Sequence, residues 1–232
     1  MPAPHRITYF SADPADYPEV HIQTLLEQQG SLLKHDPRRS QVRLLDTPSG
    51  KLLVKQPIDK DRRLWIRFLT LFRDSEAMAS LRSMQILQAH GIGTNTPLLC
   101  VEEIRFGMTV RSWMLYTYLA GEPVTQQDSA AIFELVKRIH AIGYLHGDTQ
   151  LRNFLKRDGE ILTIDCKLKP RLWGRISEQL EFIRIARANP YAQPLLQSHL
   201  VSYRIAMYFH HLANRRGHLK NQLRKLLGMT KH

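Results

Sequence analysis

The sequence is short of cysteine and of long apolar runs. Its only two cysteines, Cys100 and Cys166, are too few for a disulfide framework or a cysteine-based zinc site. No stretch approaches the roughly 18 apolar residues of a membrane-spanning helix. The N-terminal stretch MPAPHRITYFSADPADY lacks the apolar core of a signal peptide. With 12 Gly and 12 Pro the chain is not of low complexity. We therefore expect a globular, cytoplasmic protein.

Acidic residues are missing from the C-terminal part of the chain. No Asp or Glu follows Glu181, whereas nine cations do: Arg184, Arg187, Arg204, Arg215, Arg216, Lys220, Arg224, Lys225 and Lys231. The net charge of +12 indicates an anionic partner, which is nucleic acid, a membrane surface or a phosphorylated substrate. Leucines recur at helical spacing among the cations of residues 215–231. This basic tail is expected either to contact an anionic membrane or to pack its leucines on the protein.

The stretch YLHGDTQLRNFLKRDGEILTIDC carries polar residues between apolar segments. An apolar run ends at His146, and the polar loop after it holds Asp148 and Asn153. The apolar segment Ile161–Ile164 then leads to Asp165. Phosphoryl transfer needs a carboxylate at the acceptor hydroxyl and hard oxygen ligands that hold Mg²⁺ against the triphosphate. A helix, a loop and a short hairpin would bring the three polar side chains to one point.

Strands and one helix are expected before this stretch. The strand-like segments are Ser31–His35, Ser40–Leu45 and Lys51–Gln56, which form an antiparallel meander. The third ends in LLVK, at Lys55. Residues 74–89 keep apolar residues on one side of a helix. Glu76 lies near the start of that helix, where the helix dipole favours negative charge.

Further strands and then helices follow. Two strands are expected at Pro97–Glu103 and at the aromatic-rich Thr109–Leu119, and a helix capped by Asp128 at about 129–143. The remaining helices are expected at 176–188, 193–214 and 218–228, with breaks at Asn189-Pro190 and Gly217. Residues 1–20 are expected to be an extended lead-in, followed by a short helix at 20–29.

The order of Lys55, Glu76, Asp148, Asn153 and Asp165 resembles that of the protein-kinase-like fold. Within that superfamily the HGDTQLRNF loop, the size and the short basic C-terminal part are most similar to the lipopolysaccharide core heptose kinases, which are related to the Kdo kinases. The resemblance implies an α+β, two-lobed fold. Residues 1–119 would form a lobe with a small antiparallel sheet, and residues 120–232 a mainly helical lobe.

The resemblance also implies a role for each of these residues. Asp148 would be the catalytic base, and Asn153 and Asp165 would hold Mg²⁺. Lys55 would bind the ATP phosphates and pair with Glu76.

The aromatic-rich strand would end at the hinge between the lobes. By the resemblance, backbone groups near Thr117 and Leu119 would bond the adenine edge of ATP. The implied cofactors are therefore ATP and Mg²⁺.

The sequence departs from the kinase pattern at three points. No glycine-rich loop is present, and HDPRRSQ stands between the first two strands, where Arg38 or Arg39 would supply only charge. Asp165 is followed by Cys166 and Lys167 rather than by Phe and Gly. Gly147 replaces the arginine with which many protein kinases read a phosphorylated activation loop. Phosphorylation control is therefore not expected.

The resemblance implies a kinase that phosphorylates a sugar, a heptose, of the lipopolysaccharide inner core. Its partner would be a lipid-anchored anionic glycan at the cytoplasmic face of the membrane. One alternative is another kinase-like phosphotransferase, acting on a soluble small molecule or on protein. Another is a non-catalytic protein that binds RNA or anionic lipid on the same fold. Nucleic acid is the less favoured partner, because no nucleic-acid-binding motif is present.

Overall fold

The structure is a computed structural model that describes residues 5–13, 15–17, 22, 26, 30–36, 39–48 and 50–226. The chain forms two compact units, which are Met1–Pro123 with Asn153–Leu168, and Val124–Arg152 with Lys169–His232. The sequence analysis divides the chain after residue 119, close to Pro123. It assigns the segment Asn153–Leu168 to the second lobe, however, whereas in the structure this segment packs within the first unit.

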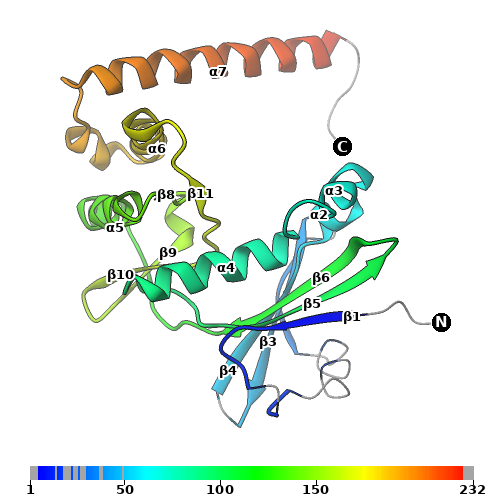
Figure 1. The fold of residues 1–232 in the computed structure, drawn as a ribbon. Coiled ribbons are helices and arrows are strands. Elements are labelled where there is room, and N and C mark those ends of the chain that lie inside the picture. The colour runs from blue at the N-terminus through cyan, green and yellow to red at the C-terminus, as the bar shows by residue number, and fades with distance from the viewer. Residues whose placement is uncertain are drawn as a thin grey trace. The chain divides into compact units, whose positions relative to one another are not determined.

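A six-stranded antiparallel sheet forms most of the first unit, in the order β1-β5-β6-β4-β3-β2 (Figure 1). Its strands are β1 His5–Tyr9, β2 Ser31–Asp36, β3 Ser40–Thr47, β4 Gly50–Gln56, β5 Pro97–Arg105 and β6 Met108–Thr117. The five strands expected from the sequence are present, with bounds shifted by a few residues. Strand β1 lies in the expected lead-in and pairs with β5, from His5 opposite Glu103 to Tyr9 opposite Leu99.

Helix α4, Glu76–Ala89, lies across one face of this sheet (Figure 1). Ser75 caps it by accepting a hydrogen bond from the Met78 N–H at 3.3 Å. Successive side chains of a strand point to opposite faces, so Leu53 and Lys55 of β4 share a face. Leu53 packs in a buried cluster with Ala77, Met78, Leu81, Met84, Cys100, Met114 and Tyr116. Lys55 therefore emerges on the side of the sheet that α4 covers.

Two short helices that the sequence analysis did not anticipate connect β4 to α4. They are α2, Ile58–Arg62, and α3, Leu64–Leu69. Neither is long enough to show a clear helical period, and α3 has no buried residue.

A hairpin completes the first unit. Strands β9, Phe154–Arg157, and β10, Glu160–Thr163, form a three-stranded sheet with β7, Glu122–Pro123. The Thr163 N–H donates to the Gly93 carbonyl at 3.0 Å. A Cβ at Gly93 would lie 2.3 Å from Leu162 Cδ2, so a larger residue there would require the Leu162 side chain to move. The contact joins the hairpin to the segment that follows α4.

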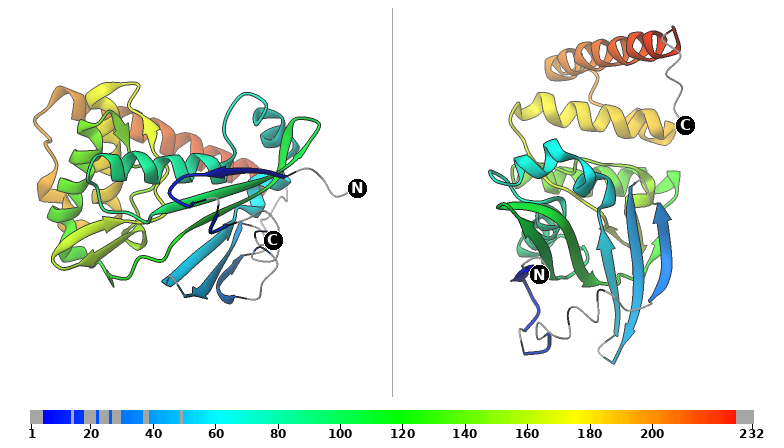
Figure 2. Two further views of the ribbon diagram at one scale, coloured as in Figure 1. Left: turned by 60° about the horizontal axis from the view of Figure 1, so that its bottom comes forward. Right: turned by 90° about the vertical axis from the view of Figure 1, so that its right-hand side faces the viewer.

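The second unit is mainly helical. It contains α5 Ser129–Ala141, α6 Gly174–Ala188 and α7 Val201–Leu226, the short 3-10 helices η1 Gln126–Asp128 and η3 Pro190–Leu195, and the two-residue strands β8 Tyr144–Leu145 and β11 Lys169–Pro170. The rings of Phe133 on α5 and Phe182 on α6 stack with centroids 4.6 Å apart. Helices α6 and α7 lie side by side (Figure 2), and Trp173 contacts Phe209 between them.

The break predicted at Gly217 is wrong. Helix α7 runs without interruption from Val201 to Leu226. A glycine inside a helix costs only about 1 kcal/mol relative to alanine, which a long helix tolerates. The break at Asn189-Pro190 is confirmed, since α6 ends at Ala188 and the Asn189 side chain caps η3 by accepting from the Tyr191 N–H.

Some expectations fall on residues that the structure does not describe. The helix expected at 20–29 lies almost wholly outside the described residues, and so do residues 227–231 of the basic tail. Within the described ranges, no helix has the length and apolar character needed to span a membrane.

Candidate active site

Lys55 and Asp165 form an ion pair in the first unit. The Lys55 ammonium contacts Asp165 Oδ1, although 110 residues separate the two in the sequence. The Lys55 side chain is only 14% exposed and comes from the end of β4, whereas the Asp165 side chain is 54% exposed. The cation expected to bind phosphate and the carboxylate expected to bind metal thus meet on the α4 side of the sheet.

The backbone of Asp165 adopts an unusual conformation. Its φ is 53°, in the left-handed region that few residues other than glycine enter. Aspartate tolerates this region better than most residues because its short polar side chain can bond locally. Such conformations occur more often than average at functional sites.

Asn153 lies beside the segment that carries Asp165. The Ile164 N–H donates to the Asn153 carbonyl at 2.8 Å, next to the pairing of Thr163 with Phe154 in the hairpin. Both expected Mg²⁺ ligands therefore belong to the same end of one hairpin in the first unit. Asn153 is 5% exposed.

The side-chain oxygens of Asp165 and Asn153 at this hairpin are of the kind that Mg²⁺ takes as ligands. No group of three or more His, Cys, Asp or Glu side chains suited to a metal occurs among the described residues. Magnesium does not need such a cage, because it is commonly held by one or two carboxylates together with waters and substrate phosphates. Asp165 would be the carboxylate ligand and Asn153 a neutral oxygen ligand.

Glu76 does not pair with Lys55 as the sequence analysis expected. Its Oε2 lies 2.5 Å from the Lys167 Nζ, two residues beyond Asp165. Nearby, the Leu168 N–H donates to the Ser83 hydroxyl of α4 at 3.0 Å. Helix α4 thus holds the segment after Asp165 through two polar contacts. Lys167, which breaks the Asp-Phe-Gly pattern, is the residue that forms one of them.

The two expected adenine-binding positions differ in their hydrogen bonding. The Thr117 N–H donates to the Thr96 carbonyl at 3.0 Å, and the Thr117 carbonyl accepts from Asn95 Nδ2 at 2.9 Å. Within the described part of the chain, the Leu119 backbone has no hydrogen bond. Leu119 is therefore better suited than Thr117 to bond an adenine edge.

The turn that replaces a glycine-rich loop is described only in part. Arg39 lies 3.9 Å from the Asp36 carboxylate, and its N–H donates to the Asp36 carbonyl at 2.9 Å. Arg38 lies outside the described residues.

Asp148 belongs to the second unit, where it follows α5 and β8. It is exposed, and its N–H donates to His146 Nδ1 at 3.4 Å. Lys55, Asn153 and Asp165 belong to the first unit. The structure thus brings together the expected phosphate and metal residues, and it holds the expected base on the other unit.

Glu181 on α6 supports the loop that carries Asp148. Its Oε1 accepts from the Gly147 N–H at 2.8 Å, and its Oε2 accepts from the His146 N–H at 3.1 Å. His140 of α5 contacts the same Oε2 through Nε2, also at 2.8 Å. One buried carboxylate therefore fixes the two residues that precede Asp148.

The pKa of Glu181 is lowered despite its burial. Desolvation raises this pKa, but the hydrogen bonds from His140 and from the Gly147 N–H outweigh it and keep the carboxylate ionised. Glu181 is not among the site residues predicted from the sequence. It is the last acidic residue of the chain, which was the only available signal, but its partners lie more than 30 residues away.

A cavity of about 530 Å³ lies within the second unit, next to α5, α6 and the segment before α7. Lys137, Arg171 and Arg175 line it, with Glu178 as the one acidic residue of the lining. Gln179 also lines it and is buried, and its Oε1 has no hydrogen-bond partner among the described residues. Arg171 pairs with Glu178 and Lys137 pairs with Glu134, so the remaining positive charge of the lining, which would attract an anionic ligand, is that of Arg175.

Comparison with known proteins identifies the fold. No model of a known protein family matches the sequence, and no curated protein matches it either. The structure is similar to that of WaaP in complex with acyl carrier protein, with a TM-score of 0.56 and 14% identity, over 97% of this chain and 100% of the WaaP chain. The kinase domain of PknI from Mycobacterium tuberculosis is a weaker match, with a TM-score of 0.44 and 14% identity over 68% of this chain and 73% of that one.

The likeness to WaaP confirms the fold class predicted from the sequence. The chain has a kinase-like α+β fold, with an antiparallel sheet in its first part and helices in its second. At 14% identity the likeness concerns the fold alone.

Proposed function

We propose that this chain is an ATP-dependent phosphotransferase that phosphorylates a sugar, a heptose, of the lipopolysaccharide inner core. The observation that carries the proposal is the meeting of Lys55 and Asp165, with Asn153 on the same hairpin. A structural ion pair alone would need neither a left-handed Asp165 nor a buried Asn153 beside it. The Lys55 ammonium would suit phosphate, and the side-chain oxygens of Asp165 and Asn153 would suit Mg²⁺.

Each residue has a chemical task in this proposal. Bound Mg²⁺ would neutralise charge on the triphosphate, and Asp165 and Asn153 would hold it. Lys55 would exchange its contact with Asp165 for the α- and β-phosphates of ATP. Asp148 would accept the proton of the acceptor hydroxyl, with its loop held rigid by Glu181.

The acceptor class rests on similarity and on charge. The fold is similar to that of WaaP, and the HGDTQLRNF loop resembles that of the lipopolysaccharide core heptose kinases. The cationic cavity beside Arg171 and Arg175 would suit a phosphate of the glycan. The net charge of +12 favours an anionic, lipid-anchored acceptor at the cytoplasmic face of the membrane. The basic tail of residues 215–231 would assist there through its cations.

The decisive experiment is transfer of labelled phosphate from ATP to delipidated core oligosaccharide in the presence of Mg²⁺. The acceptor should gain one phosphate group by mass spectrometry, and Asp148→Asn should abolish the gain. Transfer to an amino sugar or to protein, but not to the oligosaccharide, would favour the alternative kinase-like function. RNA binding without any ATP turnover would favour a non-catalytic protein.

We propose acyl carrier protein as a second partner. The WaaP structure contains acyl carrier protein, and this chain covers all of the WaaP chain in that comparison. Copurification of this protein with acyl carrier protein would indicate that the partner is shared, and its absence would leave the proposed sugar kinase activity unaffected.

A further inference from the structure

An exposed apolar stripe runs along α3 and the turn after it in the first unit. Its members are Leu64, Trp65, Phe68, Leu71 and Phe72, and all are exposed. Backbone hydrogen bonds continue the helical turn beyond α3, from Thr70 N–H to Arg67 O and from Arg73 N–H to Leu69 O. Spacings of three, four and seven residues therefore place these side chains on one face. The rings of Phe68 and Phe72 meet edge to face, with centroids 5.9 Å apart.

The hairpin between β5 and β6 extends the stripe. Phe106 stands at its tip, 94% exposed, with a positive φ of 52°. The next residue, Gly107, lies against the stripe, since a Cβ there would be 3.1 Å from Leu71 Cδ2. We call Leu64, Trp65, Phe68, Leu71, Phe72 and Phe106 the aromatic stripe. Exposed apolar side chains that gather in this way mark interaction surfaces.

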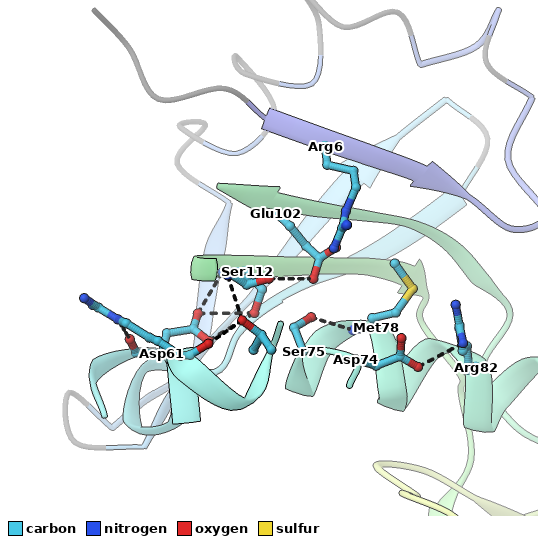
Figure 3. Close-up of polar contacts among 11 residues, drawn as sticks. Arg6, Asp61, Asp74, Ser75, Met78, Arg82, Glu102 and Ser112 are labelled. Atoms are coloured by element: carbon cyan, nitrogen blue, oxygen red, sulfur yellow. Dashed lines mark hydrogen bonds and ion pairs between the residues drawn. The ribbon is translucent and has the colours of Figure 1, made fainter. Parts of the chain in front are cut away.

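Polar contacts hold α2 and α3 against the sheet. Asp61 at the end of α2 accepts from the Ser112 N–H of β6 at 2.7 Å, and the two side chains point toward each other in Figure 3. The Thr109 N–H donates to the Thr70 hydroxyl at 2.8 Å. Polar contacts thus fix the helices to the sheet and leave the apolar face outward, although such a face is costly in water.

Arginines adjoin the aromatic stripe in the sequence. They are Arg62, Arg63, Arg67, Arg73 and Arg105. The acids among and beside them are fewer. Asp61 is buried on α2, Asp59 binds Arg63, Asp74 binds Arg82, and Glu103 binds Arg105 and Arg111. A short helix with Trp, Phe and Leu on one side and arginines around it has the composition of segments that lie in the interface of an anionic membrane.

We propose that the aromatic stripe inserts into the headgroup region of an anionic lipid bilayer and docks the first unit on the membrane. A second copy of the chain fits less well, because symmetric pairing would bring the two sets of arginines together. The proposal does not depend on the proposed kinase activity, since it concerns none of the residues assigned to that activity.

The test measures binding to vesicles of equal parts phosphatidylglycerol and phosphatidylcholine. Because the basic tail also carries cations, the background variant has Arg216, Lys220, Arg224 and Lys225 changed to Gln. In that background Trp65→Gln with Phe72→Gln should weaken binding by about tenfold or more, since two large apolar side chains no longer enter the interface. Vesicle binding through the aromatic stripe should be less sensitive to added salt than binding through the basic tail, because salt screens charge–charge attraction and not the insertion of apolar side chains.

A matched control changes two equally exposed apolar residues of the second unit, Leu172→Gln with Tyr191→Gln. These should leave vesicle binding within about twofold of the background variant. Insertion is read directly from Trp65, with Trp113 and Trp173 changed to Phe, as quenching of its emission by brominated lipid. Equal binding by the stripe variant and the background variant, both folded by circular dichroism, overturns the proposal. The proposal is also overturned if the stripe variant loses a dimer and keeps its vesicle binding.

Discussion

The Oε2 of Glu181 lies 2.8 Å from the Nε2 of His140 and also accepts the backbone N–H of His146. Two helices of the second unit and the loop before Asp148 therefore share one buried carboxylate. Since the Gly147 N–H binds the other oxygen of Glu181, the geometry of the loop depends on an acceptor at both positions.

Glu181→Gln should lower turnover and leave ATP affinity nearly unchanged. Glutamine offers one acceptor and one donor, so one backbone N–H of the loop would lose its partner, at a cost of about 1–3 kcal/mol. Steady-state kinetics would show a fall in kcat with a constant KM for ATP, because the residues proposed to bind its phosphates belong to the first unit. Glu134→Gln, which removes a surface pair with Lys137 on α5, is the control and should change neither. A shift in the ATP KM equal to that in kcat would contradict the positioning role.

Asp148→Asn should reduce turnover by about 10²–10⁴-fold, the usual contribution of general acid–base catalysis. Because Asp148 is exposed, the melting temperature should stay close to that of the wild type. Nucleotide affinity, measured by calorimetry with a non-hydrolysable ATP analogue, should also persist. Turnover within about threefold of the wild type would remove Asp148 from the role of base.

Asp165→Asn should weaken nucleotide binding in the presence of Mg²⁺ more than in its absence. Asparagine keeps the left-handed backbone that Asp165 needs, so the substitution tests charge and metal binding rather than strain. Asp158→Asn is the matched control, because Asp158 also has a φ of 52° and lies exposed in the turn between β9 and β10. Equal losses with and without Mg²⁺ would assign Asp165 a structural role.

Asp61 should make stability depend on pH. Desolvation by burial raises its pKa from 3.8 to about 7, against the hydrogen bonds from Ser112 and the charge of Arg67, which lower it. A raised folded-state pKa stabilises the fold below pH 3.8, and this contribution is lost as the pH rises to about 7. Relative to Asp61→Asn, which stays neutral, wild-type stability should therefore fall between pH 4 and 7 and then level off.

Thermal unfolding of both proteins across this range measures the effect. Asp74→Asn, which removes a surface pair with Arg82, is the control and should lack this pH dependence. A constant difference between wild type and Asp61→Asn over the whole range would mean that Asp61 ionises as an exposed aspartate does.

Local patterns in the sequence were sufficient to predict most elements. The alternation around Lys51–Gln56, the apolar period of residues 74–89 and the turn residues between strands each reflect forces within a few neighbouring residues. The order of Lys55, Glu76, Asp148, Asn153 and Asp165 is likewise visible in the sequence. The kinase-like fold was predicted from that order, and the structural comparison confirms it.

Other features depend on partners that are distant in the sequence. Strand β1 exists because it pairs with β5, almost 100 residues later, and its own residues carry only a weak strand signal. Lys167 rather than Lys55 holds Glu76, a choice that only the placement of the segment after Asp165 decides. In the sequence Glu181 looks like an ordinary helical acid, because its contact with His140 forms only when α6 packs against α5.

The sequence by itself determined which chemical groups this protein carries and the helices and strands on which they lie, because those depend on residue type and local period. The tertiary structure decided which groups meet, as with Lys55 and Asp165 across 110 residues, and which apolar side chains stay outside the core, as with Trp65 and Phe72. Burial and pairing are set by the packing of whole elements, so no local pattern encodes them.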